Sequence, residues 1–86
     1  MDPVTLTAIS LAAKYVPDII GYFKGEKAGE VAGKVIDLAQ TVTGTKTPDD
    51  AVAALDADPA LAVQFRTAVM ANEAELQRMY LSDRQD

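Results

Sequence analysis

The fold class follows from residues 26–42, EKAGEVAGKVIDLAQTV, in which apolar side chains return every three or four positions. This spacing places them along one side of an α-helix as a broad apolar stripe. The stripe contains Ala28, Val31, Ala32, Val35, Ile36, Leu38, Ala39 and Val42. Glu30 and Lys34 have the spacing of an ion pair along one helix. We therefore predict a helix over residues 26–42 that buries one wide face and stops at Gly44 in the left-handed conformation.

Before this stretch, a proline interrupts an apolar segment. Asp2 and Pro3 are the residue types expected at the N-cap and the first position of a helix. Pro17 lacks a backbone N–H and crowds the preceding turn, so it ends or kinks that first helix. A short continuation over residues 18–23 would restart with Asp18 as its cap. The apolar residues of the first helix surround much of its circumference, which leaves open whether it is buried or faces a membrane.

Two helix starts that contain proline follow residues 26–42. Thr47-Pro48 starts a short helix over residues 48–57, because Thr caps a helix and Pro suits its first position. Asp58-Pro59 repeats this arrangement and starts the longest helix, over residues 59–81. The narrower apolar seam of that helix contains Leu61, Phe65, Ala68, Val69, Leu76, Met79 and Tyr80.

The pattern as a whole predicts an all-α fold, a small helical bundle of about four helices with a proline-broken first helix. The chain of 86 residues is long enough for one core and too short for two. We expect a single helical domain over residues 1–81. The polar residues 82–86 are expected to form a tail.

The composition argues against catalysis and against nucleic acid as a partner. The chain contains no His and no Cys, so the usual general base, the usual zinc ligands and thiolate chemistry are absent. Its net charge of −5 opposes the neutralisation of phosphates by Lys and Arg on which nucleic-acid binding depends. We expect a protein that binds other proteins, with no catalytic residue, cofactor or metal ion.

The candidate contact residues fall into three groups. An aromatic and basic set around the Pro17 break suits a partner protein or a membrane surface: Lys14, Tyr15, Tyr22, Phe23, Lys24 and Lys27. Gly29 and Gly33 have the small-xxx-small spacing that allows two helices to approach closely, within the chain or in an oligomer. Asp49, Asp50 and Asp56 would form an acidic surface for a basic host protein. The competing interpretations are a role as half core and half solvated loop for the first set, and helix capping for Asp49 and Asp50.

Several short segments also occur along the chain in a recognisable order. They are Pro17-Asp18-Ile19-Ile20-Gly21, Ala39-Gln40-Thr41-Val42-Thr43-Gly44, Asp58-Pro59, Glu75-Leu76 and Tyr80-Leu81-Ser82-Asp83-Arg84. This order resembles the N-terminal region of phage holins of the gene-transfer-agent type. The resemblance implies that a membrane-spanning segment follows soon after this region. Residues 1–86 contain no such segment, so we expect either a part of a longer protein or a short natural relative.

The resemblance implies a non-catalytic binding or assembly domain of a phage holin-like lysis protein, in the host cytoplasm or at the cytoplasmic face of the inner membrane. Its partner would be a second copy, or a phage or host protein. The membrane would be reached only through missing segments or weak surface contact. Two alternatives stay open: a stand-alone phage accessory protein that binds and modulates a host protein, and a virion assembly protein that acts as a homo-oligomer.

Overall fold

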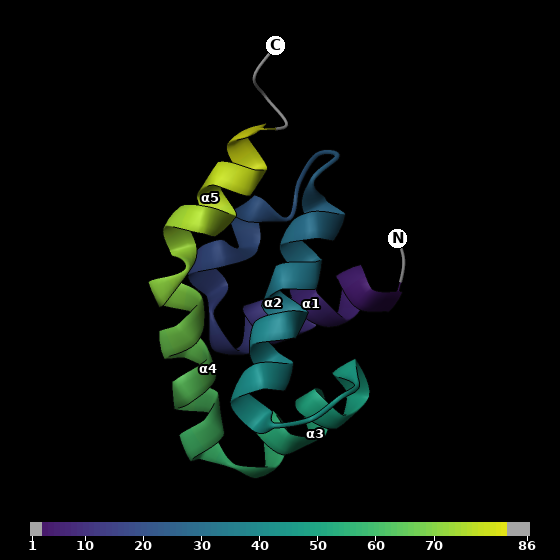
Figure 1. Cartoon of the computed structure of the whole chain (residues 1–86), viewed down its shortest axis with the longest axis vertical. Helices are drawn as coiled ribbons and strands as arrows, with labels where there is room; N and C mark the ends of the chain where they lie inside the picture. The colour runs from purple at the N-terminus through teal and green to yellow at the C-terminus, as the bar shows by residue number, and fades with distance from the viewer. Residues whose placement is uncertain (1–2, 83–86) are drawn as a thin grey trace.

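The computed structural model describes residues 3–82, which form five α-helices and one 3-10 helix and contain no strand (Figure 1). In chain order these are α1 (Pro3–Tyr15), the 3-10 helix η1 (Pro17–Tyr22), α2 (Ala28–Thr43), α3 (Pro48–Ala57), α4 (Pro59–Ala71) and α5 (Glu73–Ser82). The predicted all-α class is confirmed. The predicted number of about four helices is wrong, because η1 is a helix of its own and the predicted last helix is divided in two.

Helix α2 lies at the centre of the molecule, and α1, α3, α4 and α5 all pack against it (Figure 1). Its buried side chains are those of the predicted stripe: Val31, Ala32, Val35, Ile36 and Ala39. Buried apolar side chains from all six helices join this stripe in one core cluster. The fold is therefore arranged around one helix that buries a wide face.

The two ends of α2 differ in how well they were predicted. Gly44 ends the helix as expected, with a φ of 71° and its N–H bonded to the Gln40 carbonyl. The left-handed conformation lets the N–H of Thr45 reach the same carbonyl at 3.1 Å. At the other end, α2 begins two residues later than predicted. It follows Gly25, whose φ of 78° turns the chain.

The ion pair predicted within α2 is wrong. Glu30 Oε2 lies 2.8 Å from Lys27 Nζ, one turn earlier in the chain, instead of bonding Lys34. Lys34 Nζ reaches across to Glu75 Oε2 on α5, at 3.7 Å. A long lysine side chain on a packed helix has neighbours on other helices, and sequence spacing alone does not reveal them.

The predicted break at Pro17 is present. The N–H of Val16 still bonds the Ala12 carbonyl at 2.8 Å, but Pro17 has no N–H with which to continue α1. Val16 occupies the N-cap position of η1 and Pro17 opens its first turn, so the prediction of Asp18 as the cap is wrong. The predicted cap Asp2 lies outside the described residues.

Both proline starts after α2 fold as predicted. The Thr47 hydroxyl accepts the N–H of Asp50 at 3.1 Å, and a carboxylate oxygen of Asp58 accepts the N–H of Ala60 at 3.0 Å. These side chains satisfy N–H groups that a helix leaves free in its first turn. Helices α3 and α4 therefore begin where their capping residues place them.

The predicted single helix over residues 59–81 is wrong in one respect, because Asn72 divides it into α4 and α5. The Asn72 side-chain amide donates to the Ala68 carbonyl at 2.8 Å. Its backbone N–H bonds the carbonyls of Ala68 and Val69 at 3.2 and 3.0 Å. Asn side chains compete in this way for backbone carbonyls and favour helix ends. Of the predicted polar tail, residues 83–86 lie outside the described residues, and Ser82 is the last residue of α5.

We expect Phe65→Ala to lower the free energy of unfolding by about 3–5 kcal/mol, because it leaves a cavity in the core. Phe65 on α4 is fully buried and meets the Tyr15 ring edge-on, with the ring centres 6.3 Å apart. Urea denaturation measures the change. Val63→Ala is the matched control, since Val63 is 65% exposed on the same helix. A loss for Phe65→Ala no larger than that of the control would contradict this packing.

Candidate functional site

A cluster of Lys14, Tyr15 and Asp56 joins the end of α1 to α3. Lys14 Nζ lies 2.6 Å from Asp56 Oδ1, and the Tyr15 hydroxyl donates to the same oxygen at 2.5 Å. Lys14 Nζ also lies 5.4 Å from the centre of the Tyr15 ring. The Lys14 and Asp56 side chains are 59% and 44% exposed, so their ion pair lies at the surface, where such pairs add little stability. Its effect is to hold two helices in register.

The pKa values in this cluster move in the directions that favour the bonded forms. Hydrogen bonds from Lys14 and Tyr15 hold the pKa of the Asp56 carboxyl below its ordinary value of 3.8. The hydrogen bond to Asp56 raises the pKa of Lys14 above 10.5, and partial burial followed by the Asp56 bond raises that of Tyr15 above 10.0.

These shifts define the pH range over which the cluster contributes to stability. A lowered carboxyl pKa contributes stability that is lost as the pH falls through the folded-state value, below 3.8. A raised Lys or Tyr pKa contributes stability that is lost as the pH rises through the folded-state value, above 10.0 for Tyr15. The Lys14–Tyr15–Asp56 cluster therefore persists across the neutral range and is not a physiological pH switch.

Tyr22, from the other side of the Pro17 break, contacts α5 instead of α3. Its hydroxyl donates to Glu73 Oε2 at 3.1 Å, and its ring centre lies 5.8 Å from that of Tyr80. Partial burial, followed by the bond to Glu73, raises the pKa of Tyr22. Together with the Lys34–Glu75 pair, these contacts hold α5 against η1 and α2.

The rest of the predicted aromatic and basic set lies in the connection between η1 and α2. Phe23 is half-buried and packs against the core, Lys24 is exposed, and Lys27 pairs with Glu30. The set therefore does not act as one group, because Lys14 and Tyr15 bond to α3 while Tyr22 bonds to α5. Contact of these residues with a partner or a membrane stays a prediction.

The predicted acidic surface is divided as well. Asp56 is paired with Lys14, whereas Asp49 and Asp50 lie exposed in the first turn of α3. A carboxylate at that position interacts favourably with the positive end of the helix dipole. The geometry thus favours the structural interpretation of these acids over a continuous acidic surface.

Gly29 and Gly33 lie on the exposed side of α2. A Cβ built on either residue would meet no heavy atom within 4 Å. The two glycines therefore do not bring another described helix of the same chain close to α2. Their use against a second copy stays a prediction.

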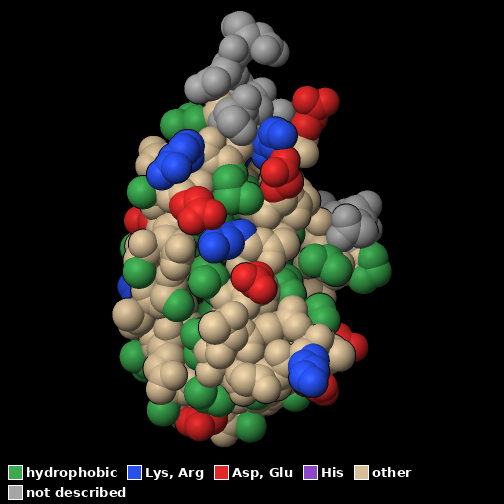
Figure 2. Space-filling model, in the orientation of Figure 1, with side chains coloured by type: hydrophobic (Ala, Val, Ile, Leu, Met, Phe, Trp, Pro, Cys, Tyr) green, Lys and Arg blue, Asp and Glu red, His purple; other side chains and the backbone are tan. Residues whose placement is uncertain are grey.

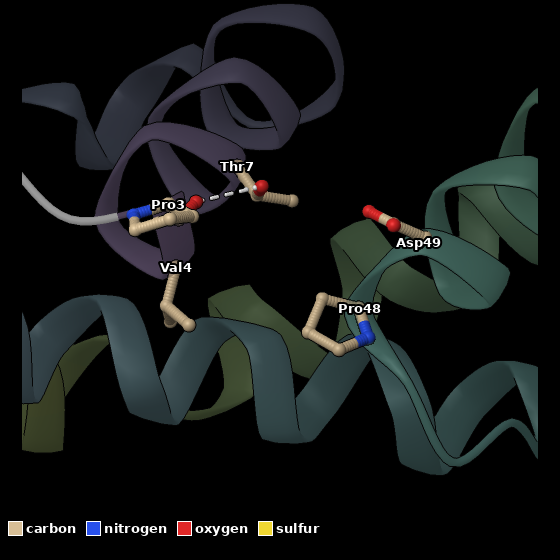
Figure 3. Close-up of a pocket in the computed structure, with 5 residues that line it drawn as sticks. All are labelled: Pro3, Val4, Thr7, Pro48 and Asp49. Atoms are coloured by element: carbon tan, nitrogen blue, oxygen red, sulfur yellow. Dashed lines mark hydrogen bonds between the residues drawn. The ribbon is translucent and has the colours of Figure 1, made fainter.

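A groove that the sequence did not predict lies between the starts of α1 and α3 (Figure 3). It has a volume of about 200 Å³ and is lined by Pro3, Val4, Thr7, Pro48 and Asp49. Figure 3 shows Thr7 and Asp49 pointing toward one another across it. The Thr7 hydroxyl donates to the Pro3 carbonyl at 2.8 Å. The apolar part of the lining is formed by Pro3, Val4 and Pro48. We call this feature the α1–α3 groove.

The α1–α3 groove follows from the directions of the two helices. Thr7 lies beside Asp49 and Lys14 binds Asp56, and both pairs are 42 residues apart, so α1 and α3 run in the same direction. The Lys14–Asp56 pair joins the helices further along α1, while the groove lies at their starts. The spread of apolar residues around the first helix was the sequence signal for this surface.

Apolar side chains are left exposed where α1 begins. Val4, in the groove, is 41% exposed, and Leu6, on another side of α1, is 53% exposed. Hydrophobic side chains appear at the surface beside the grey N-terminal residues in Figure 2. The buried side of α1 is formed by Thr5, Ala8, Leu11 and Ala12, so the first helix is partly buried and partly open. The α1–α3 groove is therefore one candidate protein-binding surface, and Leu6 is a second exposed apolar position on another side of the same helix.

Over residues 3–82, His, Cys, Asp and Glu side chains do not gather in groups of three or more that could hold a metal ion. Within the same residues, every helix is too short or too polar to cross a membrane.

We expect Lys14→Met to raise the pKa of Asp56 toward its ordinary value, because the hydrogen bond from Lys14 is the largest cause of the lowering. An NMR titration of the Asp56 carboxyl measures this pKa. Lys24→Met is the matched control, since Lys24 is exposed outside the cluster, and it should leave the Asp56 titration unchanged. Identical Asp56 titrations in the wild type and Lys14→Met would show that the pair does not form.

Comparison with protein-family models, curated proteins and solved structures finds no match to this chain. The resemblance to holins therefore stays a prediction.

Proposed function

We propose that the chain is a non-catalytic binding and assembly domain of a phage holin-like lysis protein, whose membrane-spanning segments lie outside these 86 residues. The observation that supports a binding role is the exposure of apolar side chains on two sides of the start of α1, Val4 in the α1–α3 groove and Leu6 outside it. The resemblance of the helix stops and caps to those of holins supports the class of protein.

The small exposed apolar area suits weak contacts among many copies better than tight binding of one copy to one partner. Full burial of a Val or Leu side chain contributes about 1.5–3 kcal/mol, and Val4 and Leu6 are each about half exposed. Contacts that cover both sides of α1 would together gain about 1.5–3 kcal/mol from these two residues, whereas micromolar affinity needs about 8 kcal/mol. Many copies held close together on a membrane would make such weak contacts effective, because tethering raises the local concentration.

In this proposal the described helices supply contacts between copies or with a lysis partner, and other segments make the membrane lesion. The Lys14–Tyr15–Asp56 cluster keeps α1 and α3 in register, so the α1–α3 groove is already formed before a partner arrives. A preformed surface avoids the entropy cost of ordering on binding.

The test is the gene together with a lysis assay. We expect the reading frame to continue past codon 86 into codons for apolar membrane-spanning segments, and the longer protein to lyse its host. Leu6→Asp in that protein should delay lysis, because a carboxylate opposes apolar contact. Val63→Asp is the matched control, since it places the same charge at an exposed apolar position on α4.

A stop codon directly after codon 86, together with no leakage from liposomes, would contradict the proposal. Recovery of one stoichiometric host protein from lysate, lost on reversing the charges of Asp49 and Asp50, would instead favour the accessory protein. Equal lysis times for the wild type and Leu6→Asp would remove the start of α1 from the assembly surface.

A further inference from the structure

Helices α4 and α5 are connected through one residue, Asn72. Its φ of −105° and ψ of 11° lie near the helical region, and residues 60–82 contain neither Gly nor Pro. The N–H of Asn72 bonds the Ala68 carbonyl and the N–H of Leu76 bonds the Asn72 carbonyl, as in a continuous helix. A modest change of backbone angles at this position would join α4 and α5 into one helix.

Helix α5 is attached more weakly than the helices of the core. Leu76 is fully buried, and the other residues of α5 whose side chains are described are half-buried or exposed. Glu73 and Tyr80 contact Tyr22 near the surface. By comparison, α2 buries five side chains. Detaching α5 therefore exposes less buried apolar surface than detaching α2.

The helical spacing of the buried side continues through the bend, with the polar Asn72 between its apolar residues. Phe65, Val69, Asn72, Leu76 and Met79 are spaced by four, three, four and three residues, which places them on one side of a continuous helix. A straight helix would leave Phe65 and Val69 in their own core and carry Leu76 and Met79 away from theirs. Two apolar surfaces would then be exposed, one on α5 and one on η1 and α2. They are complementary in shape, because they pack against each other in the bent form.

From these observations we infer that two copies of the chain exchange their α5 helices and form a domain-swapped dimer with Asn72 as the hinge. The interaction surface is the side of η1 and α2 that α5 covers, and its partner is the α5 of a second copy. The contacts of α5 with η1 and α2 are kept in the exchanged form, including the Lys34–Glu75 pair and the contacts of Tyr22. The exchange concerns a different surface from the α1–α3 groove and does not depend on the lysis proposal.

A cross-link across the Lys34–Glu75 pair distinguishes the two forms. Lys34 Nζ and Glu75 Oε2 are 3.7 Å apart, and the chain has no Cys, so Lys34→Cys with Glu75→Cys introduces its only thiols. A short bis-maleimide added to the full chain, refolded at high concentration, should join two chains and give a covalent dimer on a denaturing gel. At high dilution the same reagent should join the two positions within one chain.

The hinge itself is tested with Asn72→Ala in the full chain. The higher helix propensity of Ala, which acts once in each of two chains, should tighten dimerisation by about tenfold in sedimentation equilibrium. Gln77→Ala is the matched control, because Gln77 is exposed in α5 away from the bend and should leave dimerisation unchanged.

Three results would overturn the inference. They are a wild type that stays monomeric up to millimolar concentration, a dimer whose bis-maleimide cross-links all lie within single chains, and an Asn72→Ala protein that dimerises no more tightly than the wild type. The cross-linking result decides the question by itself if Asn72→Ala fails to fold, because it uses the unaltered hinge.

Discussion

The wide apolar face of α2 has to be shielded from water on several sides, and no single neighbouring helix is broad enough to cover it. Val31, Val35 and Ile36 each contribute about 1.5–3 kcal/mol on burial, whereas an exposed ion pair contributes at most about 1 kcal/mol. Apolar burial therefore decides where α1, α3, α4 and α5 lie. The helix stops and caps decide only where the chain turns so that each helix can reach α2.

The same constraint accounts for the surfaces that carry the functional proposals. Covering α2 uses one side of α1 and leaves Leu6 and the α1–α3 groove uncovered. The polar contacts at the surface, such as Lys14 with Asp56 and Tyr22 with Glu73, set how neighbouring helices align without adding much to the core. At the other end of the molecule, α5 contributes one fully buried side chain and detaches from the core more easily than the other α-helices.

Local signals made the helix starts and stops predictable from sequence. Thr47, Asp58 and Gly44 act through bonds to residues within a few positions, and Pro17 acts by lacking the N–H that would continue α1, so their types and spacing were sufficient. The bend at Asn72 was not predictable from the apolar spacing, because the seam continues through it and only tertiary packing separates a bent helix from a straight one. The Lys14–Asp56 pair and the α1–α3 groove join residues 42 positions apart, and they exist only once α2 has brought α1 and α3 together.

A stable core around α2 carries α5 as a weakly attached helix, and native-state hydrogen exchange measures this difference directly. The amides of Val35, Ile36 and Ala39 should exchange only through global unfolding, with the full dependence on denaturant. The amides of α5 after Leu76 should exchange through a smaller opening, with a lower free energy and a shallower dependence on denaturant. Equal free energies of opening for α2 and α5 amides would instead show that α5 unfolds only together with the core.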